Sequence, residues 1–162
     1  MMTDLSMNKN VVFIGQGLLR GDRIYGTLND VPVNKCLEMP IAENLIMGAA
    51  IGLSLRGFLP VVIFQRIDFM TIASDAIINH LAIMPKMSGG QLKIPMIIRT
   101  CLGAQNSKFY VGMQHNKNLI HMFSPHIKTV EVKTPQEVSN EYTNAAASTE
   151  PTLIVEHKDL YG

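Results

Sequence analysis

The chain has 162 residues, of which 47% are hydrophobic and 17% are charged, and its formal net charge is +1. This length suits one domain, and the near-neutral charge argues against nucleic acid or an anionic membrane surface as a partner. No apolar run reaches the roughly 18 residues that span a bilayer and the first residues lack the blocks of a signal peptide, so we expect a cytoplasmic protein without a membrane segment.

The first part of the chain predicts a buried strand followed by a long connection. Residues 10–14 form a short apolar run that leads into Gly15 and Gly17, and residues 18–34 are rich in glycine, asparagine and aspartate. A strand and a turn-rich loop are the expected structures. The two glycines fit an ordinary turn better than a phosphate-binding loop, because Arg20 stands where the third glycine of that motif would be.

An apolar helix is the central element that the sequence predicts. A short strand over residues 36–39 leads into a helix over residues 41–55, which Gly57 closes. Pro40 suits the first helical turn, and Glu43 lies near the positive end of the helix dipole. Since no charge follows Glu43 in this helix, we expect burial on more than one face, with little water around the carboxylate. On position alone, Glu43 is more simply a helix-start residue satisfied by backbone N–H groups.

The remainder of the chain alternates strands and helices. A long second helix is expected over residues 69–81, ending near Pro85, with shorter helices over residues 119–123 and 136–147. Buried strands are expected over residues 58–64 and 94–99, an alternating strand over residues 127–132, and a last strand over residues 152–156. This alternation predicts an α/β fold of three layers, a parallel sheet with helices on both faces. Ligands bind such sheets at the carboxyl ends of the strands, which places loops 15–34, 65–68 and 100–117 at the site.

Six short motifs occur in a fixed order along the chain. They are Met39-Pro40-Ile41-Ala42-Glu43 with Gly48 and Gly52, Pro60-Val61-Val62 with Asp68-Phe69, Met87-Ser88-Gly89-Gly90-Gln91, Pro95-Met96-Ile97-Ile98-Arg99, Gly112-Met113-Gln114-His115 and Glu156-His157-Lys158-Asp159-Leu160-Tyr161-Gly162. Together they resemble the pyrimidine-binding domain of transketolase-like thiamine diphosphate enzymes, most closely the beta subunit of the 2-oxo acid (pyruvate) dehydrogenase decarboxylase component. The resemblance covers residues 10–162 and implies the thiamine-diphosphate-binding fold, with residues 1–162 as one domain.

The resemblance assigns roles to five residues. Glu43 matches the glutamate that hydrogen-bonds the aminopyrimidine and activates the cofactor, for which an apolar setting that favours a protonated carboxyl is suitable. Phe69 matches the aromatic residue that stacks on that ring, and Gln65 is expected beside the cofactor. His115 matches a loop histidine near the reacting end, although Asn116-Lys117-Asn118 replaces the family's Ser-Gln-Ser. Arg66 replaces a phenylalanine of the family pattern and is expected to face an anionic substrate or to pair with Asp68. Without the motif, Phe69 is as well explained by core packing, and His115 by a solvated loop.

The resemblance also implies a partner. The family holds diphosphate and magnesium on a second domain with a Gly-Asp-Gly motif, whereas here Gly21-Asp22 is followed by Arg23 and no such motif occurs. We therefore expect no metal ligands in this chain, an alpha-type diphosphate-binding subunit that shares the cofactor, and a homodimer or hetero-oligomer. Neither the diphosphate-binding domain nor the family's C-terminal domain is recognisable. Gly48-x-x-x-Gly52 fits a subunit interface or close packing inside the domain. The alternatives are a non-catalytic assembly module and a ketol or acyl transferase.

Overall fold

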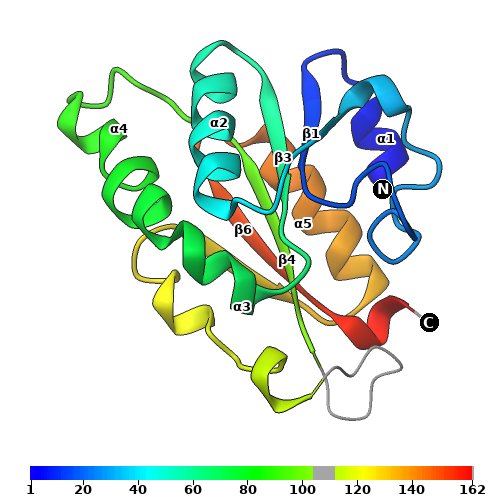
Figure 1. Ribbon diagram of the computed structural model, residues 1–162. Coiled ribbons are helices and arrows are strands. Elements are labelled where there is room, and N and C mark those ends of the chain that lie inside the picture. Colours follow the sequence, from blue (N-terminus) through cyan, green and yellow to red (C-terminus); the bar gives the residue numbers. More distant parts are fainter. Residues whose placement is uncertain (104–111, 162) are drawn as a thin grey trace.

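The computed structural model describes residues 1–103 and 112–161, and a six-stranded parallel sheet forms its centre (Figure 1). The strands lie in the order β2-β1-β3-β4-β6-β5, and every neighbouring pair is parallel. Their bounds are β1 Val11–Gly15, β2 Cys36–Glu38, β3 Leu59–Ile63, β4 Ile97–Leu102, β5 Lys128–Val132 and β6 Thr152–His157. The parallel sheet predicted from the alternating pattern is therefore confirmed.

Helices cover both faces of the sheet (Figure 1). One face carries α2 (Glu43–Leu55), α3 (Ile67–Met70) and α4 (Met84–Met87), and the other carries α1 (Met2–Ser6) and α5 (Pro135–Ala147). Each face has its own apolar core, since side chains of parallel strands alternate between the two sides. Shorter turns of 3-10 helix occur at Val33–Lys35, Thr71–Ala73, Met113–His115, Ile120–Met122 and Lys158–Tyr161, and a π-helical segment at Ala76–Leu81.

Helix α2 starts later than predicted, and it is more exposed than predicted. It begins at Glu43, so Pro40 precedes the helix and does not lie in its first turn. Its end is as predicted, because Gly57 has a φ of 86° and its N–H donates to the Ser54 carbonyl at 2.9 Å. The prediction that this helix is buried on more than one face is wrong. One stripe of the helix is open to solvent, and it includes Leu45, which is 55% exposed.

The predicted long second helix is interrupted. Between residues 67 and 87 the chain passes through α3, a 3-10 turn, the π-helical segment and α4. The Thr71 hydroxyl donates to the Asp68 carbonyl at 2.7 Å and so competes with the helical hydrogen bonds at the first break. Pro85 has no N–H to donate and limits the next segment. Apolar spacing alone does not reveal such breaks.

The third strand lies further along the chain than predicted. Strand β4 begins at Ile97, not at residue 94, because Pro95 cannot donate to a ladder, and it continues to Leu102. Residues 100–102 of the predicted loop 100–117 are therefore strand, and its central part, residues 104–111, lies outside the described residues. Helix α5 is as predicted, with the Thr134 hydroxyl accepting the Glu137 N–H at 3.2 Å as its cap.

The connection 18–34 contains a left-handed turn built from residues other than glycine. Arg23, Ile24 and Tyr25 have φ angles of 48°, 52° and 57°, a conformation that costs about 1–2 kcal/mol per such residue. The Arg23 guanidinium stabilises this turn by donating to three backbone carbonyls of the same connection, each at 2.9 Å. The turn carries Tyr25 to the carboxyl edge of the sheet, where its hydroxyl donates to the Gln65 carbonyl at 3.4 Å.

Within residues 1–103 and 112–161, no single helix has the length and apolar composition needed to cross a bilayer. The segments Ile67–Ala73 and Ala76–Met87 meet that composition only when they are joined, and they are bent by 63° relative to each other.

Candidate functional site

The predicted site residues meet at the carboxyl ends of the central strands. Gln16 follows β1, Gln65 follows β3, and Glu43 opens α2 beside them. Together with Phe69 these side chains line one small pocket of about 20 Å³, which Ile46, Ile63 and Phe64 complete. The structure therefore brings together three residues that the sequence analysis assigned to the cofactor.

Glu43 carries a carboxylate that is open to a ligand. It is the first residue of α2 and is half-buried. Within the described part of the chain, its side chain caps no N–H group and has no other hydrogen-bond partner. The simpler explanation from sequence, a carboxylate satisfied by its own helix, is therefore not what the structure shows. A half-buried acceptor that has no partner among the described residues and shares its pocket with apolar side chains suits a ligand that donates a proton.

Gln16 is the site residue that the sequence analysis did not select. The Gln65 amide Nε2 donates to Gln16 Oε1 at 2.9 Å, so the two amides form one polar wall of the pocket. The flanking glycines serve this packing. A Cβ at Gly15 would lie 2.5 Å from the Ile63 carbonyl oxygen, and one at Gly17 would lie 3.0 Å from Gln65 Nε2. The glycines thus permit close approach of β1 and β3, and the ordinary-turn interpretation fits them. In the sequence, the position of Gln16 directly after the first predicted strand could have marked it as a site residue.

Phe69 and His115 lie side by side. Phe69 is in α3, directly after β3, and His115 ends the 3-10 turn Met113–His115. Their ring centroids are 5.1 Å apart and the rings meet edge to face at 62°. His115 Nδ1 is buried and has no hydrogen-bond partner among the described residues. The Phe69 ring, which lines the pocket, is therefore adjacent to an imidazole whose buried Nδ1 has no partner among the described residues.

Arg66 contacts the histidine turn. Its side chain is 6% exposed, and Nη1 donates to the His115 carbonyl at 3.2 Å. The alternative partner from sequence, Asp68, has one buried oxygen, Oδ1, that accepts no hydrogen bond from the described residues. Arg66 thus contacts the backbone of His115 and not the Asp68 carboxylate oxygen Oδ1.

A buried charged network lies next to the site on the α5 face. Arg99 and Glu156 are 2% and 3% exposed, and Arg99 Nε and Nη2 donate to Glu156 Oε2 at 3.0 and 2.9 Å. Tyr142 donates to Glu156 Oε1 at 2.5 Å, and Tyr161 donates to Oε2. Burial raises the pKa of Glu156, but the Arg99 charge and these hydrogen bonds outweigh it and hold the pKa below its ordinary value. Arg99 Nη1 also donates to the Thr27 hydroxyl, which ties the loop to the sheet.

A second buried group links this network to the site. Lys158 Nζ donates to the Tyr25 hydroxyl at 2.7 Å and lies 4.0 Å from the centre of that ring. Burial lowers the pKa of Lys158 to about 8 and raises the pKa of Tyr25 to about 12. The Cys101 thiol donates to the Gln65 carbonyl at 2.8 Å, and burial raises its pKa to about 11. Cys101 is therefore a protonated core thiol at neutral pH.

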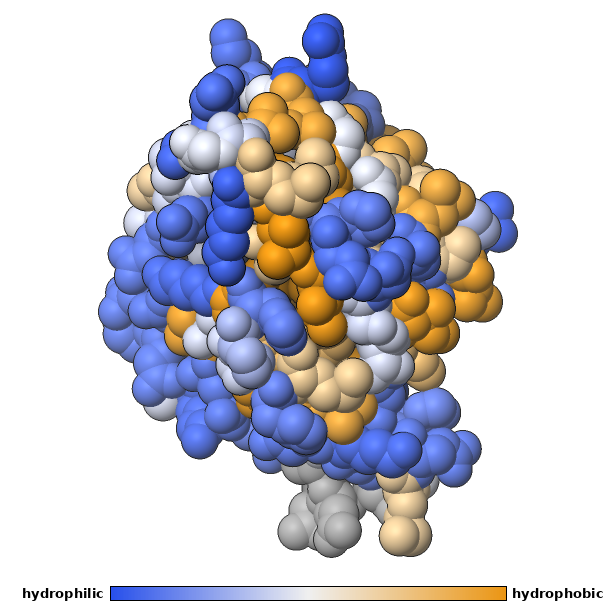
Figure 2. Space-filling model, turned by 90° about the vertical axis from the view of Figure 1, so that its left-hand side faces the viewer, coloured by the Kyte–Doolittle hydropathy of each residue, from blue (hydrophilic) through white to orange (hydrophobic). Residues whose placement is uncertain are grey.

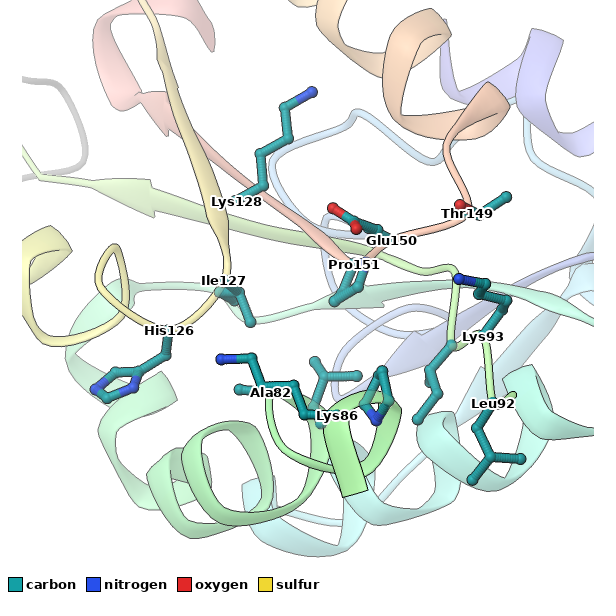
Figure 3. Close-up of a pocket in the computed structure, with 13 residues that line it drawn as sticks. Ala82, Lys86, Leu92, Lys93, His126, Ile127, Lys128, Thr149, Glu150 and Pro151 are labelled. Carbon is teal, nitrogen blue, oxygen red and sulfur yellow. The ribbon is translucent and has the colours of Figure 1, made fainter. Parts of the chain in front are cut away.

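Two of the larger hollows, which lie away from the predicted residues, carry charged side chains. One, of about 200 Å³, opens at the amino ends of β4 and β6, the opposite edge of the sheet (Figure 3). Its charged rim is formed by Lys86, Lys93, Lys128 and Glu150. Figure 3 shows Lys128 pointing away from Ala82 and Lys86, so the cations do not converge on one point. The other, of about 350 Å³, is lined by apolar side chains of α5 and the N-terminus above the satisfied Arg99–Glu156 pair. Neither contains Glu43, Phe69 or His115.

Comparisons with known proteins show the family of the chain. The sequence pattern of the transketolase pyrimidine-binding domain matches residues 3–162. The beta subunit of acetoin:2,6-dichlorophenolindophenol oxidoreductase of Cupriavidus necator is 34% identical over 131 residues, which are 80% of this chain and 38% of that subunit. The pyruvate dehydrogenase E1 component beta subunit of Chlorokybus atmophyticus is 28% identical over 98% of this chain and 48% of its own length. A split-gene transketolase, described as an inactive beta4 tetramer, has a TM-score of 0.74 at 18% identity over 97% of this chain and 48% of that one. The chain thus spans about half the length of these relatives or less.

Proposed function

The chain belongs to the family of transketolase pyrimidine-binding domains, and on that premise we propose that it supplies the pyrimidine half of a thiamine diphosphate site in a split 2-oxo acid dehydrogenase or transketolase-like enzyme. The observation that carries the proposal is Glu43, a half-buried carboxylate without a hydrogen-bond partner among the described residues, in a pocket shared with Phe69 and Gln65.

The residues fit the cofactor that the family implies. When bound, thiamine diphosphate supplies the carbanion chemistry of such enzymes. Glu43 would hydrogen-bond the aminopyrimidine and share a proton with it, and Phe69 would offer a flat apolar surface to the ring. The Gln16–Gln65 amide pair lines the same pocket and supplies polar groups for its edge. His115, with a buried and unpaired Nδ1 beside Phe69, holds or moves a proton at the substrate end.

The geometry of the pocket supports a shared site. Ligand sites usually enclose about 300–1,000 Å³, whereas the Glu43 pocket measures about 20 Å³. The chain therefore offers one wall, and we assign the diphosphate and magnesium to an alpha-type partner chain. Within the part of the chain that the structure describes, no group of three histidine, cysteine, aspartate or glutamate side chains could hold a metal ion.

The exposed face of α2 supports the proposal that a partner chain covers the Glu43 pocket. Leu45 is 55% exposed and Ile41, just before the helix, is 78% exposed. At Gly48 and Gly52, a Cβ would meet no atom of the described chain within 4 Å, so these glycines do not serve close packing inside the domain. Figure 2 shows a band of hydrophobic surface on the left-hand side of Figure 1, the side on which α4 lies. Apolar surface of this kind is typical of a protein interface.

The experiment that tests this proposal compares two isosteric changes in the complex of this chain with its diphosphate-binding partner. Glu43→Gln removes the proposed proton acceptor, and we expect turnover of a 2-oxo acid to fall about 10²- to 10⁴-fold, the usual contribution of a general acid or base. Glu150→Gln removes an exposed carboxylate at the opposite edge of the sheet and should leave turnover unchanged. Equal rates for wild type and Glu43→Gln would refute the role of Glu43. Tight cofactor binding without turnover in the wild type would instead favour a non-catalytic module.

A further inference from the structure

Arg66 joins the two elements that carry the aromatic and the imidazole groups of the site. Its backbone carbonyl accepts the N–H groups of Phe69 and Met70, at 3.2 and 3.4 Å, and so opens α3. Its guanidinium Nη1 donates to the His115 carbonyl at 3.2 Å. One residue is thus bonded through its backbone to the helix of Phe69 and through its side chain to the turn of His115.

The His115 turn is also held by contacts of Asn116. Gly112 has a φ of 97°, and its carbonyl accepts the Asn116 amide Nδ2 at 2.9 Å. The Asn116 side chain also lies against Gly103, where a Cβ would collide with its Oδ1. These contacts fix the shape of the turn, and Arg66 attaches the turn to the end of β3.

The hydrogen bond from Arg66 to the His115 carbonyl is well placed to fix the position of the turn. Arg66 is 6% exposed, so its hydrogen bond to the His115 carbonyl has little competition from water. Within residues 1–103 and 112–161, no other side chain hydrogen-bonds the backbone of His115. The imidazole itself has no described hydrogen bond at Nδ1, and its ring lies 5.1 Å from Phe69. The position of the ring therefore depends on the backbone that carries it and on its contact with Phe69.

We propose that Arg66 is a positioning residue that acts through His115 and does not itself contact the substrate. It holds the imidazole against Phe69, so that His115 meets the substrate end of the site in one orientation. This replaces the substrate-facing role that sequence alone predicted for Arg66, and it rests on the function proposed above.

The test compares Arg66→Met and Arg66→Lys with the wild type in the complex with the partner chain. Met keeps an apolar stem in the buried space, and Lys restores a charged donor. A hydrogen bond from a charged group contributes about 10- to 100-fold to a local equilibrium. We therefore expect amide hydrogen exchange of residues 112–116 to rise about 10-fold or more in Arg66→Met, with exchange in β1 and β3 unchanged. Arg66→Lys should recover part of the protection.

Kinetics and cofactor titration complete the test. We expect kcat to fall at least 10-fold in Arg66→Met, with KM for a 2-oxo acid and the dissociation constant of thiamine diphosphate within about twofold of wild type. A rise in KM with unchanged exchange at residues 112–116 would show that Arg66 binds substrate directly and would overturn the proposal. Faster exchange throughout β3 and β4 would show a general structural role and would overturn it as well. If the wild-type complex binds no thiamine diphosphate, the proposed function fails, while the exchange result still decides whether Arg66 positions His115.

Discussion

Glu156→Gln removes the negative charge of the buried Arg99–Glu156 pair. The carboxylate is 3% exposed and accepts two hydrogen bonds from Arg99, at 2.9 and 3.0 Å, and one each from Tyr142 and Tyr161. Glutamine has the same shape but no charge, so the Arg99 guanidinium would stay buried without this counter-charge. Removing one partner of a buried ion pair costs about 3–5 kcal/mol, a large part of the 5–15 kcal/mol that stabilises a typical domain.

Urea unfolding followed by circular dichroism measures this cost. We expect Glu156→Gln to lose about 3–5 kcal/mol at pH 7, and the double variant Arg99→Met with Glu156→Gln to recover about 2 kcal/mol, because no charge is then left unpaired. The pKa of Glu156 is held below its ordinary value of 4.5, so its contribution is complete above that pH and is lost as the pH falls further. Below pH 4.5, the free energy of unfolding should therefore fall less steeply with falling pH in Glu156→Gln than in the wild type. A single-variant cost under about 1 kcal/mol, or costs that simply add in the double variant, would refute this reasoning.

Three further predictions concern the cofactor wall, the partner face and pH. Phe69→Ala should weaken thiamine diphosphate binding by the complex roughly 10-fold in calorimetry, because a stacking surface is lost; unchanged affinity would remove Phe69 from the wall. Leu45→Asp should weaken association with the partner chain by at least 10-fold in analytical ultracentrifugation, since it places a charge on the apolar stripe, whereas Met7→Asp, also at an exposed position, should not. The pKa of Cys101 is raised from 9.0 to about 11, so its stabilising contribution is complete below pH 9 and about 2–3 kcal/mol is lost as the pH rises through 11. Cys101→Ala should flatten that alkaline loss in urea unfolding; identical pH profiles would contradict it.

Much of the fold could be predicted from the hydrophobic periodicity of the sequence and from the residues that mark the ends of helices. Strands β1 and β3 are continuous apolar runs because both faces of the parallel sheet are covered there, and Gly57 marked the end of α2 correctly. The breaks between residues 67 and 87 could not be predicted, because the Thr71 back-bond and the π-helical segment keep the apolar spacing of a continuous helix. The left-handed turn at Arg23 was equally hidden, since it depends on carbonyl contacts with residues that the pattern does not place.

The site was predicted in part, through matched motifs and not through local chemistry. Glu43, Gln65 and Phe69 line one pocket as expected, because the ends of neighbouring parallel strands meet at one edge of the sheet. Gln16 carries no motif, and its role appears only when β1 and β3 pair with Gly15 opposite Ile63. The link from Arg66 to His115 spans 49 positions and depends on how the histidine turn folds back over β3, which no spacing in the sequence encodes.

The claim that this chain forms one half of a cofactor site is tested most directly by titrating thiamine diphosphate and magnesium into three samples by calorimetry: the chain alone, the diphosphate-binding partner alone, and the two together. Because the Glu43 pocket of the single chain measures about 20 Å³, we predict no measurable binding to this chain alone and binding at least 100-fold tighter in the complex than in either component. Tight binding by the isolated chain, together with turnover of a 2-oxo acid by that chain unaided, would contradict the shared site.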